Sequence, residues 1–213
     1  MNGRTHPSSR PLTDKSADTR SSGITGVILA GGRGRRMGGV DKGLQLFRGR
    51  QMVEWVLERL APQVSEILIN ANQNLQRYAS LGHRVVPDDI AGFAGPLAGL
   101  HRGMLEAGRP LVITVPCDSP FLPADLVSRL LQGLQHERAD LAVARTGDRS
   151  HPVFCLAHAR LLPHLERFLS AGGRKIDAWY ADLRVVEVPF DDEAKAFGNF
   201  NTLEELREAE SGG

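Results

Sequence analysis

The stretch LAGGRGRRMGGVDKG, residues 29–43, combines six glycines with four cationic side chains and follows the apolar run ITGVILA at residues 24–30. Small residues let backbone N–H groups approach an anion closely, and arginine and lysine side chains can surround that anion. A glycine-rich loop on its own is equally typical of a solvated turn. Its place directly after a strand-like run favours the first interpretation, so the stretch predicts a polyphosphate-binding loop at the end of a first strand.

The loop differs from both common phosphate-binding motifs. After Gly32-x-Gly34, a dinucleotide-binding fingerprint requires glycine at position 37, where the chain has Met37. A Walker A loop requires Gly-Lys followed by Ser or Thr, but Lys42 stands between an aspartate and a glycine. The loop therefore fits neither the Rossmann dinucleotide-binding class nor the Walker A class.

Strand-like and helical patterns alternate along the chain around this loop. Short β-branched and apolar runs predict strands at residues 24–30, 64–71, 83–89 and 111–118. Apolar residues at helical spacing predict helices at residues 51–60, 74–82, 97–107 and 123–134. Such alternation is typical of a three-layer, Rossmann-like α/β fold, in which a mostly parallel central sheet carries helices on both faces.

The pattern is looser beyond residue 139. Two strand-like segments that could form a hairpin stand at residues 140–146 and 151–158, and helices are expected at 159–170 and 174–183. A last strand is predicted at residues 184–190, and Thr202 and Glu205 have capping-box spacing for a terminal helix. We expect residues 1–22 to form a disordered tail and residues 23–213 a single domain. The change of pattern near residue 139 divides this domain into residues 23–138 and a second lobe at residues 139–213.

Composition limits the classes of partner. The 213 residues carry a formal net charge of +1, which gives no global attraction to nucleic acid or to an acidic membrane. The chain contains no apolar segment long enough for a secretory signal or a membrane span. We therefore expect a cytoplasmic protein that binds neither nucleic acid nor membrane.

Several other residues have a structural interpretation at this stage. Cys117 and Cys155 lack metal-binding spacing, so we expect buried thiols in a reducing compartment. Trp55 and Trp179 stand in helical patterns and are predicted to lie in the core.

Polar residues end three further predicted strands. Asn70 ends the second strand, Asp88 follows the third, and Asp118 ends the fourth. Ligands bind outside the carboxyl ends of the strands in an open parallel sheet, so these residues and the 29–43 loop form the candidate site. Alternatives exist for each of them: a turn former for Asn70, a solvated acidic pair for Asp88 and Asp89, and a helix cap for Asp118.

Taken together, the motifs resemble a known family. LAGGxxxRMGGxDKG, the strand end at Asn70, PDD followed by GPLAG, PCD at residues 116–118 and NFNT at residues 199–202 resemble the molybdenum cofactor guanylyltransferases. The resemblance covers the chain from Ile24 to the last predicted helix, and it implies the nucleotidyltransferase form of the fold. It also implies that the enzyme transfers GMP from GTP to the terminal phosphate of molybdopterin. Pyrophosphate would be released, the guanine dinucleotide form of the cofactor would be made, and magnesium would be required.

The resemblance assigns roles residue by residue. Contacts with the guanine and ribose are implied for Leu29, Ala30 and Gly31, and a position near the phosphates is implied for Gly32. The catalytic residues would be Arg36 and Lys42, which would hold the triphosphate, and Asp118, which would bind Mg²⁺ beside the GTP. Further nucleoside contacts are implied for Asn70, Asp88 and Gly99. Positions near the metal or the acceptor phosphate are implied, more weakly, for Asn199 and Asn201. The resemblance also implies that residues 23–138 bind the nucleotide and residues 139–213 bind molybdopterin, which His151 could approach if its role is not structural.

Two other functions remain open on the residues alone. A related cytidylyltransferase or sugar-phosphate nucleotidyltransferase would share the first motif, although such cytidylyltransferases carry LAAG where this chain has LAGG, and Gly31 leaves room for a purine. A non-catalytic pterin- or nucleotide-binding delivery protein would have lost the lysine or the metal ligand, and both Lys42 and Asp118 are present. The expected partners are GTP and molybdopterin, with transient contacts to molybdoenzymes or their chaperones, and we expect a monomer.

Overall fold

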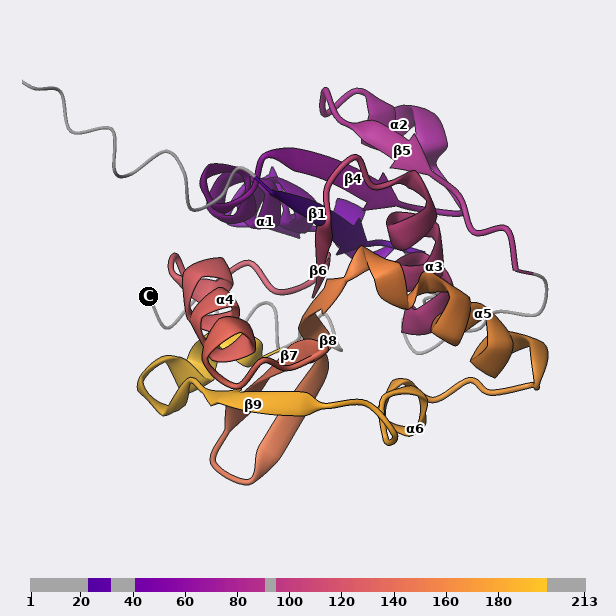
Figure 1. The fold of residues 1–213 in the computed structure, drawn as a ribbon. Helices are drawn as coiled ribbons and strands as arrows, with labels where there is room; N and C mark the ends of the chain where they lie inside the picture. Colours follow the sequence, from indigo (N-terminus) through magenta and orange to yellow (C-terminus); the bar gives the residue numbers. More distant parts are fainter. Residues whose placement is uncertain (1–22, 32–40, 91–94, 199–213) are drawn as a thin grey trace, which may run out of the picture.

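The structure is a computed structural model that describes residues 23–31, 41–90 and 95–198. Within these residues, a seven-stranded sheet forms the centre of the molecule (Figure 1). Its strands, in spatial order, are β5 (Arg84–Val86), β4 (Glu66–Asn70), β1 (Ile24–Leu29), β6 (Leu111–Pro116), β8 (Arg149–His158), β7 (Leu141–Thr146) and β9 (Val185–Pro189).

The sheet is mostly parallel, as predicted. Strands β5, β4, β1 and β6 run in one direction, and β7 pairs with β9 in parallel. Strand β8 is antiparallel to both of its neighbours, because it forms the predicted hairpin with β7 and also pairs with β6. The register pairs Leu29 with Asn70 and with Pro116, and Asn70 with Val86. The four parallel strands therefore end together, and the residues that follow them meet at one edge.

Helices cover both faces of the sheet, which confirms the three-layer architecture. Figure 1 shows α1 (Met52–Leu60) and α4 (Leu126–His136) on one side, and α3 (Pro96–Glu106) and α5 (Leu162–Ser170) on the other. The apolar side chains of each pair belong to a different core cluster. Helix α1 buries the apolar stripe predicted from its spacing, which consists of Met52, Val53, Val56, Leu57 and Leu60.

Shorter elements complete the described part of the chain. They include two 3-10 turns beside α1 and α5, a third after β9, and a small helix after β4. Their bounds are η3 (Ala61–Gln63), η4 (Ala159–Leu161), η5 (Asp191–Phe197) and α2 (Leu75–Ala79). The turn η2 (Lys42–Leu44) contains the lysine of the opening motif.

Three details differ from the predictions. A two-stranded sheet of β2 (Leu46–Phe47) and β3 (Arg50–Gln51) was not expected, because strands of two residues show no periodicity. Helix α6 covers only Ile176–Trp179, whereas a helix at 174–183 was predicted. The helix is short because the segment buries only the side chain of Trp179, and a single helical turn is enough to bury it. The core placement of Trp55 is confirmed only in part, since its ring packs against the small cluster of Phe47 and Met52 but is half-buried beside Arg50. Its indole N–H donates to the Phe47 carbonyl.

Two predicted segments lie outside the described residues, namely the tail at residues 1–22 and the terminal helix with Thr202 and Glu205. The division of the domain near residue 139 stays a prediction, although β7, β8 and β9 join the same sheet as β1. Among the described helices, none combines the length and the apolar character needed to cross a membrane.

Candidate nucleotide site

The predicted site residues that the structure describes gather at the carboxyl edge of the parallel strands. Backbone hydrogen bonds extend the sheet beyond the strand ends, because Ala30 N donates to the Asn70 carbonyl (2.8 Å) and Cys117 N to the Leu29 carbonyl (3.2 Å). Ala30 is buried, and Gly31 and Leu29 are half-buried. The beginning of the glycine-rich loop is therefore held between β4 and β6.

An amide–carboxylate network joins the ends of β4 and β5. The Asn70 amide Nδ2 donates to Asp88 Oδ1 (2.8 Å) and to the Val86 carbonyl (3.1 Å), and only 2% of Asn70 is exposed. The solvated acidic pair was therefore the wrong interpretation of Asp88, whereas Asp89 is exposed and forms an ion pair with Arg102. A buried amide fixed by two acceptors is more than a turn former, because its orientation is determined.

The two glycines of this region lie close to the network. A Cβ atom on Gly31 would lie 3.2 Å from Asn70 Oδ1, and one on Gly99 would lie 2.5 Å from the same atom and 2.4 Å from Leu29 Cδ2. Gly99 lies on α3, so its missing side chain lets that helix approach the ends of β1 and β4 closely. The predicted nucleoside-contacting residues are thus neighbours in space.

Lysine and aspartate meet in a second cluster beside this network. Lys42 Nζ lies 3.0 Å from Asp118 Oδ2, which joins the turn η2 to the segment after β6. Asp118 is 7% exposed, and α4 begins only at Leu126, so the helix-cap interpretation was wrong. A half-buried cation beside a buried carboxylate can bind phosphate oxygens and a divalent cation together.

The turn that carries Lys42 is itself held from α2. The Tyr78 hydroxyl donates to Asp41 Oδ1 (2.5 Å), and Asn74 Nδ2 donates to Asp41 Oδ2 (3.0 Å). Tyr78 is fully buried; burial, followed by the neighbouring Cys117 and the bond to Asp41, raises the pKa of its hydroxyl well above the ordinary value. The hydroxyl therefore stays protonated and remains a donor. Gly43 fits against it, because a Cβ atom there would lie 2.6 Å from the Tyr78 oxygen.

The donor chemistry of the site suits magnesium better than zinc. Among the described residues, no group of three or more histidine, cysteine or acidic side chains could hold a metal ion. Mg²⁺ prefers oxygen ligands and keeps several waters, so a single carboxylate together with substrate phosphates is a sufficient site. The carboxylate of Asp118 fits this requirement.

Four other residues singled out in the sequence are buried. Cys117 and Cys155 are buried free thiols, as predicted, and burial raises the pKa of Cys155 to about 11. His151 is buried and stacked on Phe197, with its Nε2 2.7 Å from Thr146 Oγ1. Trp179 is fully buried, as predicted.

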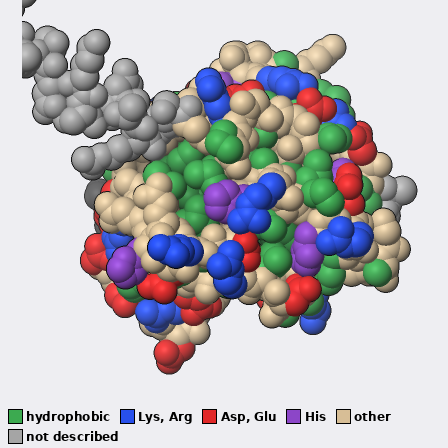
Figure 2. All heavy atoms as spheres, in the orientation of Figure 1, with side chains coloured by type: hydrophobic (Ala, Val, Ile, Leu, Met, Phe, Trp, Pro, Cys, Tyr) green, Lys and Arg blue, Asp and Glu red, His purple; other side chains and the backbone are tan. Residues whose placement is uncertain are grey.

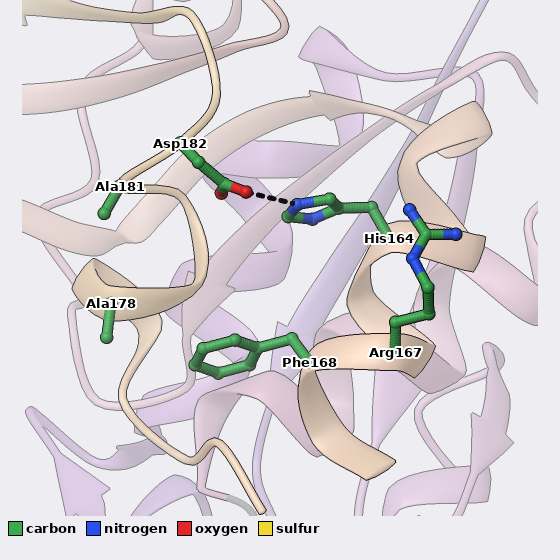
Figure 3. A pocket seen from close by; sticks show the side chains of 6 residues that line it. All are labelled: His164, Arg167, Phe168, Ala178, Ala181 and Asp182. Carbon is green, nitrogen blue, oxygen red and sulfur yellow. Dashed lines mark hydrogen bonds and ion pairs between the residues drawn. The ribbon is translucent and has the colours of Figure 1, made fainter. Parts of the chain in front are cut away.

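The described side chains form a hollow of about 570 Å³ between α5 and the segment of α6 (Figure 3). Figure 3 shows His164 and Asp182 pointing toward one another, with His164 Nε2 3.3 Å from Asp182 Oδ2. Its lining contains none of the predicted site residues. On the face drawn in Figure 2, positive and negative side chains of the described residues are interspersed, so no broad patch of one sign covers that face.

Sequence reasoning missed three side chains that position the predicted ones: Asn72, Tyr78 and Asp41. Asn72 is the nearest to a detectable signal, because residues 70 and 72 of an extended chain point to the same side. Gly32, Arg36, Asn199 and Asn201 lie outside the described residues, so their roles stay predictions.

Comparison with known proteins identifies the family. A sequence model of the MobA-like NTP transferase domain matches residues 26–185. A molybdenum cofactor guanylyltransferase of Cupriavidus necator is 52% identical over 193 residues, which are 88% of this chain and 96% of the relative. One of Bordetella petrii is 53% identical over 189 residues, 87% of this chain and 96% of the relative. The chain belongs to the molybdenum cofactor guanylyltransferase family.

Solved structures agree with this family assignment. Molybdopterin-guanine dinucleotide biosynthesis protein A from Archaeoglobus fulgidus superposes with a TM-score of 0.73 at 26% identity, covering 88% of this chain and 97% of that one. A 2-C-methyl-D-erythritol 4-phosphate cytidylyltransferase from Thermus thermophilus superposes with a TM-score of 0.64 at 19% identity, covering 87% of this chain and 96% of that one. The guanylyltransferase family thus shares its Rossmann-like fold with a nucleotidyltransferase of other specificity. The family model and the relatives of about 52% identity show that the chain is itself a nucleotidyltransferase.

Proposed function

We propose that this chain transfers the GMP part of GTP to the terminal phosphate of molybdenum-loaded molybdopterin, with Mg²⁺ as cofactor. The products are pyrophosphate and the guanine dinucleotide form of the cofactor. The observation that carries this proposal is the 3.0 Å contact between Lys42 and Asp118 at the same sheet edge as the Asn70–Asp88 network. The names of the relatives that are about half identical support the choice of GTP and molybdopterin.

The reaction brings two anions together, which determines what the site must do. A phosphate oxygen of molybdopterin attacks the α-phosphorus of GTP, the bond to the β-phosphate oxygen breaks, and pyrophosphate leaves. Two unit charges about 4 Å apart interact by roughly 4 kcal/mol near a protein surface. Catalysis therefore depends mainly on neutralising and positioning the phosphates, and no covalent enzyme intermediate is needed.

The chain's own residues supply this neutralisation. Lys42 would bind triphosphate oxygens and stabilise the charge that gathers on the departing pyrophosphate, together with Arg36. Asp118 would hold Mg²⁺, which supplies further positive charge to the phosphate oxygens when bound. Because the acceptor phosphate is already ionised near neutral pH, we assign no general base.

Binding of the nucleoside falls to the neighbouring network. Leu29, Ala30 and Gly31 would line the guanosine, with Gly32 near the phosphates, and Asn70, Asp88 and Gly99 would complete the nucleoside contacts. Asn199 and Asn201 would approach the metal or the acceptor phosphate. Molybdopterin would bind residues of the 139–213 part, and a monomeric cytoplasmic enzyme would pass the product to molybdoenzymes or their chaperones.

Pyrophosphate release by the purified full-length protein tests the proposal. With Mg²⁺, GTP and molybdenum-loaded molybdopterin present, we expect stoichiometric release of pyrophosphate, and omission of any one of the three should abolish it. Absence of release in the complete mixture would contradict the proposal. Replacing GTP by CTP in the same assay tests the cytidylyltransferase alternative, which predicts faster release with CTP.

A further inference from the structure

Asn72 stands outside the residues implied by the family resemblance, yet it has the most connected side chain of the nucleoside network. It lies two residues beyond the end of β4 and is half-buried. Between Asn70 and Asn72, the amide of Ala71 donates to the Val86 carbonyl (3.2 Å), which continues the pairing of β4 with β5. The extended backbone therefore turns the side chains of Asn70 and Asn72 to the same side.

Both ends of the Asn72 amide bind Asp88, which is 16 residues away in the chain. Asn72 Oδ1 accepts a hydrogen bond from Asp88 N (2.9 Å), and Asn72 Nδ2 donates to Asp88 Oδ2 (2.7 Å). The same Nδ2 lies 3.4 Å from the Gly31 carbonyl oxygen at the start of the glycine-rich loop. One side chain thus holds the backbone and the carboxylate of Asp88 and also contacts the loop.

The Asp88 carboxylate is consequently held from two sides. Asn70 donates to Oδ1 at 2.8 Å, and Asn72 donates to Oδ2 at 2.7 Å. A carboxylate offers about four acceptor positions, so each oxygen keeps capacity for a further donor. Rotation of the carboxyl group would break both bonds, and its plane is therefore set before a nucleotide arrives.

We propose that Asn72 is a positioning residue for base specificity, which orients the Asp88 carboxylate to accept the two adjacent N–H donors of guanine. This inference rests on the proposed function, because it takes GTP as the nucleotide. Guanine presents N1–H and its 2-amino group side by side, which match the two oxygens of one carboxylate. Hypoxanthine lacks the 2-amino group, and adenine places a lone pair at N1 that the carboxylate repels.

A purely structural role for Asn72 predicts different behaviour. A residue that only stabilised the loop would weaken the binding of every nucleotide alike when replaced. A residue that orients Asp88 affects GTP more than ITP, because only GTP offers the second donor. The ratio of GTP to ITP affinity therefore separates the two roles.

The test is equilibrium binding of GTP, ITP and CTP to the full-length protein with Mg²⁺, measured by isothermal titration calorimetry. Asn72→Asp keeps the size of the side chain and the acceptor for Asp88 N, but it replaces the Nδ2 donor with an oxygen facing Asp88 Oδ2. Asn72→Ala removes both bonds and serves if the aspartate variant fails to fold. Gln73→Ala, an exposed neighbour on the same segment, is the matched control.

We expect wild type and Gln73→Ala to bind GTP more tightly than ITP by the same ratio. Each folded Asn72 variant should lower that ratio about tenfold, the effect of one hydrogen bond to a charged group. In the turnover assay the KM for GTP should rise, while kcat at saturating GTP stays within about twofold, because the reacting phosphates are untouched. An unchanged GTP-to-ITP ratio in the Asn72 variants would overturn the inference. A wild-type protein without preference for GTP over CTP would instead overturn the proposed function, and the role of Asn72 with it.

Discussion

Gly99→Ala tests the geometry of the nucleoside network with a single methyl group. That group would lie 2.4 Å from Leu29 Cδ2 and 2.5 Å from Asn70 Oδ1, both well inside van der Waals contact. The leucine methyl can move aside, whereas Asn70 is buried and bonded to Val86 and Asp88. The strain is therefore expected to fall on Asn70 and through it on Asp88.

The expected effects on stability and on binding differ in size. Overpacking lowers the unfolding free energy by about 1–3 kcal/mol, while the higher helix propensity of alanine compared with glycine raises it by about 1 kcal/mol. The net loss of unfolding free energy is about 0–2 kcal/mol, which lowers Tm by no more than about 8 °C in a chain of this size. A displaced Asp88 would weaken its proposed contact with the nucleotide, a hydrogen bond to a charged group worth about 1.5–3 kcal/mol, which raises the KM for GTP at least about tenfold.

Gly103→Ala is the matched control, because Gly103 lies one turn further along α3. A methyl group there would lie 2.7 Å from Val27 Cγ2, in the core of β1 and not at its end. Steady-state kinetics with varied GTP and thermal unfolding should show similar Tm changes in both variants, but a raised KM only in Gly99→Ala. Equal KM changes in the two variants, or an unchanged KM in Gly99→Ala, would refute the proposed link from Gly99 through Asn70 to the nucleotide.

Three further predictions concern the other parts of the site and the core. Asp118→Ala should lower magnesium-dependent turnover at least about a hundredfold without a change in circular dichroism. The control Asp177→Ala, on α6, should keep wild-type turnover. Near wild-type turnover in Asp118→Ala would rule out the metal role. Tyr78→Phe should lower the unfolding free energy measured in urea by about 1 kcal/mol, because Asp41 loses its buried hydrogen-bond donor. It should also reduce kcat, because the turn that carries Lys42 loses this support. A wild-type unfolding free energy together with a wild-type kcat would contradict this prediction. Burial, with a smaller contribution from Arg149, holds the pKa of His151 below its ordinary value of 6.5, so the unfolded chain takes up this proton at higher pH than the folded one. The contribution of neutral His151 to stability is complete above pH 6.5 and is lost as the pH falls from there toward the folded pKa. Urea titrations should therefore show that the unfolding free energy falls less between pH 8 and pH 5 in His151→Gln than in wild type. Equal falls in the two proteins would refute this prediction.

The sheet and the position of the site follow from local patterns. The alternation of strand-like and helical segments up to residue 139 predicts parallel strands, and parallel strands bring their carboxyl ends to one edge. Asn70, Asp88 and Asp118 therefore meet the glycine-rich loop there although they are far apart in the chain. No such argument places β8, because a hairpin strand can pair on either side, and here it inserts between β6 and β7.

The contacts that position the site residues could not be predicted from the sequence, because they depend on tertiary packing. Tyr78 reaches Asp41 across 37 residues, and it does so because α2 packs its aromatic ring into the core beside Gly43. Asn72 follows a strand whose last residue already carries a polar side chain, so its bonds to Asp88 became visible only with β5 in place. The shortness of α6 has the same origin, since tertiary contact buries only Trp179 of that segment.

The most direct test of the central claim is the mass of the dinucleotide formed in competition. Full-length protein, Mg²⁺ and molybdenum-loaded molybdopterin would be incubated with equal concentrations of GTP and CTP, and the pterin products identified by mass spectrometry. The proposed function and the positioned Asp88 carboxylate predict the guanine dinucleotide in large excess, with one pyrophosphate released for each molecule formed. Cytosine dinucleotide as the main product, or pyrophosphate released without any pterin dinucleotide, would contradict the account.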